Sequence, residues 1–242
     1  MYQVRKLADN IYTFEEGMRV RSFLIIGQEK AMMLDSGNGA VDFEQELPKL
    51  TSLPVILVNT HGDGDHIGRN DLFETRYIHK KDLAKLRERR PDESECYQFV
   101  KDGDEFDLGG VVLRVIESPG HTPGSIMLYD EANKVMFGGD TLTSENTFAF
   151  SPSVDHKQLA ETMKALIVKN YEVETLLVCH DACPIHNYEQ LLCDSLGALE
   201  NYVAGKPETD IFHIKKGPLD KYAKRYIYGC ASLLTEIVAK PE

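Results

Sequence analysis

Thr60-His-Gly-Asp-Gly-Asp-His-Ile-Gly68 is the most informative stretch of this chain. It directly follows the apolar run Val55-Ile-Leu-Val58, whose β-branched content predicts a buried strand. Imidazole and carboxylate ligands together suit zinc, iron or manganese. The end of one predicted strand thus carries four candidate metal ligands within six residues: His61, Asp63, Asp65 and His66.

Three further candidate ligands follow other predicted strands. His121 lies in Ser118-Pro-Gly-His-Thr-Pro-Gly124, Asp140 lies in Phe137-Gly-Gly-Asp-Thr-Leu142, and His180 ends the run Leu176-Leu-Val-Cys-His180. Each comes after an apolar run, and loops at strand ends often carry functional side chains. The sequence therefore predicts that ligands from both halves of the chain converge at one edge of the fold.

Composition and charge narrow the classes of function. The chain has 242 residues, with 42% hydrophobic and 27% charged residues, as expected of a globular protein. Its net charge of −12 argues against partners such as nucleic acid or an anionic membrane surface. The basic cluster at 80–90 is interleaved with acids and is interpreted as a solvated helix face.

The expected location is cytoplasmic. No apolar run approaches the roughly 20 residues of a membrane span. No basic segment followed by an apolar core opens the chain, so we expect no secretory signal. The five cysteines have no framework spacing, which favours a reducing compartment.

Patterning along the chain predicts strands before helices in each half, with no linker rich in proline, glycine or serine. One domain with two facing sheets and helices outside is the economical arrangement. Strands are predicted within 2–35 and at 55–60, 76–79, 100–137, 174–179 and 211–215, and helices at 42–50, from about 67, and at 82–90, 155–169, 187–203 and 219–238.

His61-x-Asp63-x-Asp65-His66, followed in order by His121, Asp140 and His180, resembles the metallo-β-lactamase superfamily. The usual signature there is His-x-His-x-Asp-His, then His, Asp and His. Leu34-Asp35-Ser36-Gly37 also resembles the early Asp-x-Gly element of that family. The resemblance implies an α/β fold, the αββα four-layer sandwich of the metallo-β-lactamase type. It implies a single domain over 1–242, with 205–242 as a C-terminal extension that packs near the active site.

The resemblance also implies two divalent metal ions, foremost zinc. Water held between two cations loses a proton near neutral pH and can attack a polarised carbonyl. Asp65 and Asp140 are then the catalytic candidates, with Asp140 also bridging the ions and Asp65 orienting or relaying the proton. One ion is expected on His61, Asp63 and His121, and the other on Asp65, His66 and His180.

Asp63 departs from the usual signature, which has histidine at this position. If Asp63 binds metal, the first site gains oxygen and negative charge, which favours iron or manganese over zinc. The flavodiiron branch of the superfamily also has a carboxylate here, although this chain lacks the flavin domain of those enzymes. Otherwise Asp63 is too short to reach, and the protein works with one metal or is degenerate.

The leading hypothesis is therefore a hydrolase of a small-molecule ester, thioester or lactone, similar to glyoxalase II or to lactonases. The alternative is a non-haem diiron oxidoreductase that uses oxygen or nitric oxide, and a third possibility is a degenerate binding protein. The acidic charge argues against a nuclease, and the missing export signal argues against a periplasmic β-lactamase. Fold alone does not choose among these chemistries, and the sequence gives no oligomeric state.

Several other residues receive weaker assignments. Asp35 is expected to steady the ligand loop without binding metal. The loop 141–153 follows Asp140, and its Phe148 and Phe150 either wall the site or belong to the core. Surface or core roles are expected for four further histidines: His79, His156, His186 and His213. The tail around Tyr222, Tyr226 and Tyr228 resembles the variable C-terminal part that caps the site in many members of the superfamily, and the alternative is that these tyrosines only pack.

Overall fold

The computed structural model describes residues 1–17, 20–91, 96–144, 146–150, 152–180, 183–216 and 219–241. Its internal contacts divide the chain into two compact units. The N-terminal unit comprises Met1–Glu117 and Gly124–Asn133, and the C-terminal unit comprises Ser118–Pro123 and Lys134–Glu242. The single domain expected from the sequence stays a prediction. Among the described residues, no helix combines the length and apolarity that crossing a bilayer requires.

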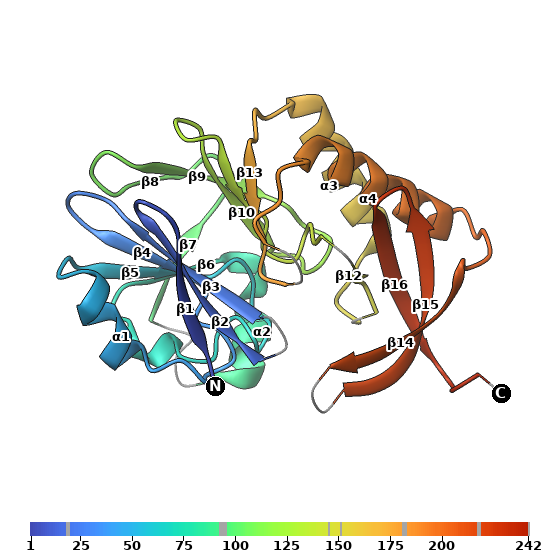
Figure 1. Cartoon of the computed structure of the whole chain (residues 1–242), viewed down its shortest axis with the longest axis horizontal. Coiled ribbons are helices and arrows are strands. Elements are labelled where there is room, and N and C mark those ends of the chain that lie inside the picture. Colours follow the sequence, from blue (N-terminus) through green and yellow to red (C-terminus); the bar gives the residue numbers. More distant parts are fainter. Residues whose placement is uncertain are drawn as a thin grey trace. The chain divides into compact units, whose positions relative to one another are not determined.

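The N-terminal unit contains a sheet of seven strands that pair in chain order (Figure 1). The first three pairings are antiparallel, as predicted for the hairpins near the N-terminus, and β4 to β7 pair parallel. The strands are β1 (Gln3–Ala8), β2 (Ile11–Glu16), β3 (Val20–Ile26), β4 (Ala31–Leu34), β5 (Val55–Val58), β6 (Arg76–His79) and β7 (Tyr97–Val100).

Parallel pairing requires crossover connections, and these connections place the candidate ligands. Helix α1 (Phe43–Leu50) joins β4 to β5, and η3 (Lys80–Asp82) with α2 (Leu83–Arg89) joins β6 to β7. The carboxyl ends of β4, β5 and β6 therefore meet at one edge of the sheet. The segments that begin with Asp35, Asn59 and Lys80 leave the sheet from that edge.

Two apolar clusters fix these helices. Phe43 of α1 is buried beside Phe14, Leu57 and Phe73, with Leu47 packed against the same cluster. The ring centroid of Phe43 lies 5.1 Å from that of Phe14 and 5.9 Å from that of Phe73, and both pairs have edge-to-face geometry. Helix α2 is anchored in the same way, because its Leu86 is buried with three residues of the unit: Ile67, Ile78 and Tyr97.

An antiparallel ladder completes the N-terminal unit. It comprises β8 (Glu105–Asp107), β9 (Val112–Glu117) and β10 (Ile126–Asp130). Gly109 and Gly110 both have positive φ, 84° and 79°, and form the hairpin turn predicted between β8 and β9. The Ile126 amide donates to the Thr60 carbonyl at 2.9 Å, so β10 also supports the ligand loop.

The C-terminal unit combines a short parallel pair, two helices and a sheet (Figure 1). β11 (Val135–Phe137) pairs parallel with β13 (Thr175–Leu177). Helix α4 (Tyr188–Val203) packs against α3 (His156–Lys169) and against the sheet. The sheet has the strand order β12-β16-β15-β14, with β12 (Thr147–Phe148), β14 (Asp210–Lys216), β15 (Leu219–Tyr228) and β16 (Ala231–Val238).

The N-terminus of α3 is capped as the sequence predicts. The Asp155 carboxylate accepts hydrogen bonds from the amides of Lys157 and Gln158 at 3.1 and 3.0 Å. Such a cap satisfies amides that have no partner within the helix. The Asp155 amide in turn donates to the Gly120 carbonyl at 2.8 Å, so the start of α3 holds the loop that contains His121.

Two predictions of helix are wrong. Residues 219–238 form the antiparallel pair β15–β16, with Gly229 at a φ of 56° in the turn. Pairing with neighbouring strands outweighs local helix propensity in this aromatic and β-branched segment. No α-helix opens near Ile67 either: the segment forms only the 3-10 turn η2 (Asn70–Leu72), because the residues before it are committed to the ligand loop.

Phe148 and Phe150 pack against the core of the C-terminal sheet. Their ring centroids lie 5.7 Å apart, and both rings contact the buried cluster that includes Ile214 and Leu234. Of the two roles left open by the sequence, the structure supports core packing. The C-terminal tyrosines also pack within their unit: Tyr226 meets Tyr202 edge to face at 5.2 Å, and Tyr222 stacks on His213 at 4.4 Å.

Candidate metal centre

The N-terminal unit brings together the two histidines of the ligand loop. The imidazoles of His61 and His66 are buried, and their ring centroids lie 4.0 Å apart. Each Nε2 faces a carboxylate of the same loop. His61 Nε2 lies 3.4 Å from Asp63 Oδ2, and His66 Nε2 lies 3.9 Å from Asp65 Oδ1. The four candidate ligands of this stretch are thus adjacent in space as well as in sequence.

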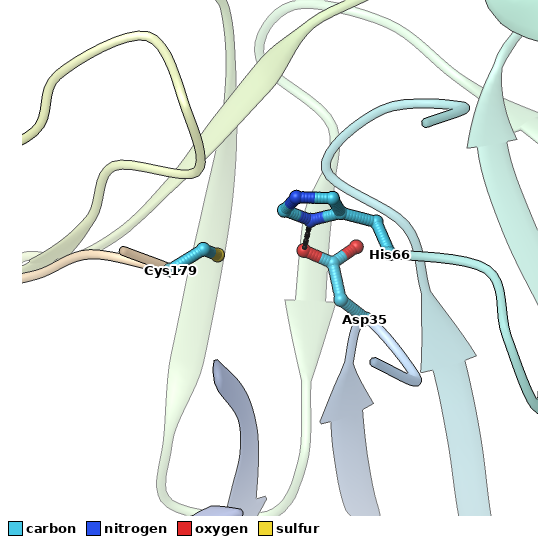
Figure 2. Close-up of side chains that lie close together, drawn as sticks. All are labelled: Asp35, His66 and Cys179. Atoms are coloured by element: carbon cyan, nitrogen blue, oxygen red, sulfur yellow. Dashed lines mark hydrogen bonds and ion pairs between the residues drawn. The ribbon is translucent and has the colours of Figure 1, made fainter. Parts of the chain in front are cut away.

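Asp35 fixes the orientation of both imidazoles. Its Oδ2 lies 2.8 Å from His66 Nδ1 (Figure 2). The Thr60 hydroxyl donates to the same oxygen at 2.7 Å, and this hydroxyl also lies 3.0 Å from His61 Nδ1. Because a hydroxyl has one proton, Thr60 must accept from His61 Nδ1–H. In the neutral rings, both Nδ1 atoms then carry the proton, and Nε2 presents the lone pair that a metal requires.

The ionised form of Asp35 is favoured by these contacts. Burial alone would raise the pKa of this carboxyl, but His66, His61 and the Thr60 hydroxyl more than offset it and hold the pKa below its ordinary value. The Thr60 amide also donates to Oδ1 at 2.7 Å. The expectation that Asp35 steadies the ligand loop agrees with this network.

The far end of the ligand loop is tied to the loop after β4. The His66 carbonyl accepts from the Ser36 amide at 2.8 Å and from Asn59 Nδ2 at 3.0 Å. The Gly68 amide donates to the Gly37 carbonyl at 2.8 Å. A Cβ at Gly68 would lie 2.5 Å from that carbonyl oxygen, so only glycine permits this approach.

Asp63 makes an ion pair that the sequence did not predict. Its Oδ1 lies 2.5 Å from Lys85 Nζ, and both side chains are about four-fifths buried. Arg90 of the segment after α2 also donates to the Gly68 carbonyl, and the Arg89 guanidinium lies against Gly64. The interpretation of 80–90 as a purely solvated helix face is therefore wrong, because three of its cations contact the ligand loop.

Asp82 is a second residue that sequence reasoning missed. This buried carboxylate accepts from the Gly62 amide through Oδ2 and from the Gly124 amide through Oδ1, both at 2.7 Å. It thereby ties the ligand loop to the segment that leads into β10. A Cβ at Gly124 would lie 2.7 Å from Asp82 Oδ1, which explains the glycine there. No local sequence pattern indicates this role, because Asp82 and Gly124 lie 42 residues apart in the chain.

We predict that Asp82→Asn lowers the free energy of unfolding by about 2 kcal/mol. The amide group keeps the shape of the side chain, but its NH2 must face a backbone N–H that needs an acceptor, and a buried donor without an acceptor is costly. Urea unfolding of the two proteins measures the difference. Asp9→Asn, at an exposed turn of the same unit, should change stability by less than about 0.5 kcal/mol. Equal effects of the two substitutions would contradict the structural role of Asp82.

The C-terminal unit holds the other three candidates. Asp140 Oδ2 lies 3.2 Å from His180 Nε2 and 3.7 Å from His121 Nε2, so two imidazoles face one carboxylate oxygen. Asp140 follows β11 and His180 follows β13, at the same end of this parallel pair. The three candidate ligands of this unit are therefore adjacent, with Asp140 between the two imidazoles.

Threonines support the loop that carries His121. Thr162 of α3 donates to the Pro119 carbonyl at 2.6 Å, and the Ser118 and Thr141 hydroxyls lie 2.9 Å apart. Thr141 adjoins Asp140, so the Ser118–Thr141 contact links the two ligand segments of this unit. Gly120, at a φ of 139°, would collide with Leu159 if it had a side chain. The sequence marks this loop only through its prolines and glycines.

The histidines that the sequence analysis set aside have other partners. His79 Nε2 lies 3.1 Å from Glu117 Oε1, and His213 Nε2 lies 2.6 Å from Asp220 Oδ1. His156 and His186 bond to the backbone carbonyls of Ala149 and Glu174 at 2.7 and 3.1 Å. These contacts agree with structural roles and leave the candidate ligands as two sets, four residues in one unit and three in the other.

Comparisons with known proteins agree with this geometry. A family profile described as "Metallo-beta-lactamase superfamily" matches residues 17–180. The chain is 26% identical over 167 residues to acyl-coenzyme A thioesterase MBLAC2 of Gallus gallus, covering 53% of this chain and 60% of that protein. It is 37% identical over 87 residues to hydroxyacylglutathione hydrolase of Methylococcus capsulatus, covering 36% of this chain and 33% of that protein.

Solved structures give the same picture of the fold. A metallo-beta-lactamase from Pontibacter korlensis superimposes with a TM-score of 0.70 at 19% identity, covering 83% of this chain and all of that one. The first curated relatives are longer than the region they share with this chain, which spans 52% to 66% of their length.

Proposed function

Because the chain belongs to the metallo-beta-lactamase superfamily, we propose that it is a metal-dependent hydrolase of small-molecule thioesters. The α/β fold of the metallo-β-lactamase type that the sequence predicts is confirmed, because a solved metallo-beta-lactamase structure superimposes on the chain. Two relatives of known name, a thioesterase and a hydroxyacylglutathione hydrolase, act on thioesters by those names. They favour thioesters among the esters, thioesters and lactones that the sequence left open.

The donor set of the two units fits divalent metal ions. Four imidazoles and three carboxylates suit zinc, and the Nδ1 contacts of His61 and His66 present Nε2 as the ligand atom. These Nδ1 contacts, at 3.0 Å for His61 and 2.8 Å for His66, are the observation that carries the proposal. We propose that His61, Asp63 and His121 would hold one ion, that Asp65, His66 and His180 would hold another, and that Asp140 would be shared between them.

The chain's own residues then have distinct tasks. Bound metal ions would lower the pKa of water and polarise the substrate carbonyl. Asp35 and Thr60 keep the imidazoles of His61 and His66 in the ligating tautomer. The Asp65 carboxylate, one-third exposed, can accept a proton and pass it to the leaving thiolate. Asp140 lies within 3.7 Å of the Nε2 atoms of both His121 and His180, so these three side chains would meet at bound metal.

The diiron oxidoreductase has no support among the relatives described above. That alternative depended on extra negative charge from Asp63, and the ion pair with Lys85 offsets this charge. A small-molecule substrate fits the named relatives. The absence of nucleic-acid and membrane partners and a cytoplasmic location stay predictions.

We expect the purified protein to hydrolyse acyl-coenzyme A or S-acylglutathione, and chelation to remove this activity. Thiol release measured with a chromogenic disulfide, before and after EDTA treatment, tests both points. Zinc added back after removal of the chelator should restore the rate, because the water must be activated by metal. A matched oxygen ester and a lactone serve as controls for substrate class.

Two results would contradict the proposal in different ways. Thioester hydrolysis that survives complete metal removal, verified by elemental analysis, would exclude metal-dependent chemistry. A protein that binds two metal ions but leaves every thioester intact, while cleaving the lactone or ester, would exclude the substrate class and keep the hydrolase.

A further inference from the structure

The Asp63–Lys85 pair has a consequence for metal selection, which rests on the proposed metal-dependent function. Asp63 uses its two oxygens differently: Oδ1 lies 2.5 Å from Lys85 Nζ, and Oδ2 lies 3.4 Å from His61 Nε2. We propose that Lys85 is a positioning residue that holds Asp63 by one oxygen and cancels its charge, so that the His61 site selects zinc over manganese.

The backbone fixes Lys85 in this position. Helix α2 begins at Leu83, and Asp82, at its N-terminal end, binds the Gly62 amide of the ligand loop. A Cβ at Gly62 would lie only 3.3 Å from Lys85 Cβ, so the first turn of α2 lies directly against the loop. Leu86, the next residue, is fully buried and prevents the helix from turning. Lys85 is therefore directed at Asp63 by the packing of its helix.

Charge and ligand hardness give the pair its effect. A carboxylate adds a negative charge and a hard oxygen, and both favour manganese relative to an imidazole ligand. Lys85 supplies the opposite charge at contact distance, and solvent screens the pair weakly because both side chains are only 19% exposed. Together, Asp63 and Lys85 have the net charge of a neutral histidine. Because Oδ1 is held by Lys85, Asp63 offers metal one oxygen instead of a chelating pair.

Competition between zinc and manganese on metal-free protein tests the proposal without any activity measurement. We expect Lys85→Met to shift the ratio of the two affinities at this site toward manganese by about tenfold, the smaller end of the effect of residues that contact ligands. Titration calorimetry and elemental analysis after dialysis against both ions measure this ratio. Lys81→Met, an exposed lysine one turn earlier, is the matched control and should keep the wild-type ratio.

Two more variants separate charge from packing. Lys85→Arg keeps the cation and should retain the wild-type ratio, whereas Lys85→Gln keeps a hydrogen-bond donor and should behave like Lys85→Met. Asp63→His should lose zinc affinity at this site, because Lys85 then faces an imidazole, and combining it with Lys85→Met should restore that affinity. If Lys85→Met is poorly folded by circular dichroism, the Gln variant carries the test.

The outcomes separate this inference from the proposed function. An unchanged ratio in folded Lys85→Met or Lys85→Gln would overturn the role of Lys85, even if the enzyme is a zinc hydrolase. A shift of equal size in Lys81→Met would also overturn it, because any loss of basic charge would then suffice. If the wild-type protein binds neither zinc nor manganese, both the role of Lys85 and the proposed hydrolase function are wrong. If the metal selectivity is as expected but no thioester is hydrolysed, only the proposed function is wrong.

Discussion

Asp140→Ala should reduce kcat/KM for thioester hydrolysis about 1000-fold or more and should lower the amount of bound metal. Asp140 Oδ2 faces the Nε2 atoms of both His180 and His121, at 3.2 and 3.7 Å. Its removal takes away the one carboxylate shared by two proposed ligand sets. Metal stabilisation of the transition state is worth several kcal/mol, and each 1.4 kcal/mol is a factor of ten in rate.

Steady-state kinetics and elemental analysis of the same preparations measure this effect. Asp140→Asn should fall between wild type and Asp140→Ala, because it keeps an oxygen ligand but loses the charge. Asp220→Ala, at an exposed position of the same unit, is the control and should leave both quantities unchanged. Full activity and metal content in Asp140→Ala would exclude Asp140 from the metal centre.

Asp35→Asn should lower the free energy of unfolding by about 2–4 kcal/mol, because buried donors that bind this carboxylate lose an acceptor at about 1–3 kcal/mol each. Asp35 is fully buried and bonds to His66 Nδ1 and to the amide and hydroxyl of Thr60. The asparagine can offer only one acceptor oxygen to these three donors. Metal affinity should also fall about 10- to 100-fold, because the tautomers of both imidazoles are no longer fixed.

The pH dependence of stability supplies an independent check on Asp35. Its pKa is lower in the folded protein than in the unfolded chain, where it lies near about 4. The folded state thus binds fewer protons, and the stabilisation is present above about pH 4 and lost as the pH falls through the folded pKa. Urea unfolding from pH 7 downward should show the difference between wild type and Asp35→Asn shrinking below about pH 4. A difference that grows on acidification would contradict the shift.

Local sequence patterns were sufficient to predict most of the strands and turns that position the candidate ligands. Four candidate residues follow strand ends as predicted, each about one to three positions after the last residue of its strand. They are Asp35 after β4, His61 after β5, Asp140 after β11 and His180 after β13. The cap at Asp155 and the glycine turn between β8 and β9 are likewise properties of a few neighbouring residues. Because strands and turns have short periods and characteristic residues, such elements can be predicted without knowing their partners.

The C-terminal hairpin shows where local patterns fail. Residues 219–238 contain enough helix-forming side chains to suggest a helix, but in the structure they pair as β15 and β16. β14 and β12 supply the flanking pairings, and Thr147 of β12 pairs with Leu233 of β16, which lies 86 residues later in the chain. Strand stability depends on such distant neighbours, and a window of sequence does not contain them.

The sequence by itself identified the seven candidate ligands, their order and the fold class, because a metal site requires particular residue types at strand ends. Tertiary structure decided which other residues control those ligands: Thr60 and Asp35 for the histidine tautomers, Asp82 for the loop, and Lys85 for Asp63. The physical reason is distance along the chain. The bonds that Asp35 and Asp82 make to the ligand loop and to Gly124 join residues that are 20 to 42 positions apart in the sequence. Only the packing of α2 and of the parallel strands brings these atoms within bonding range.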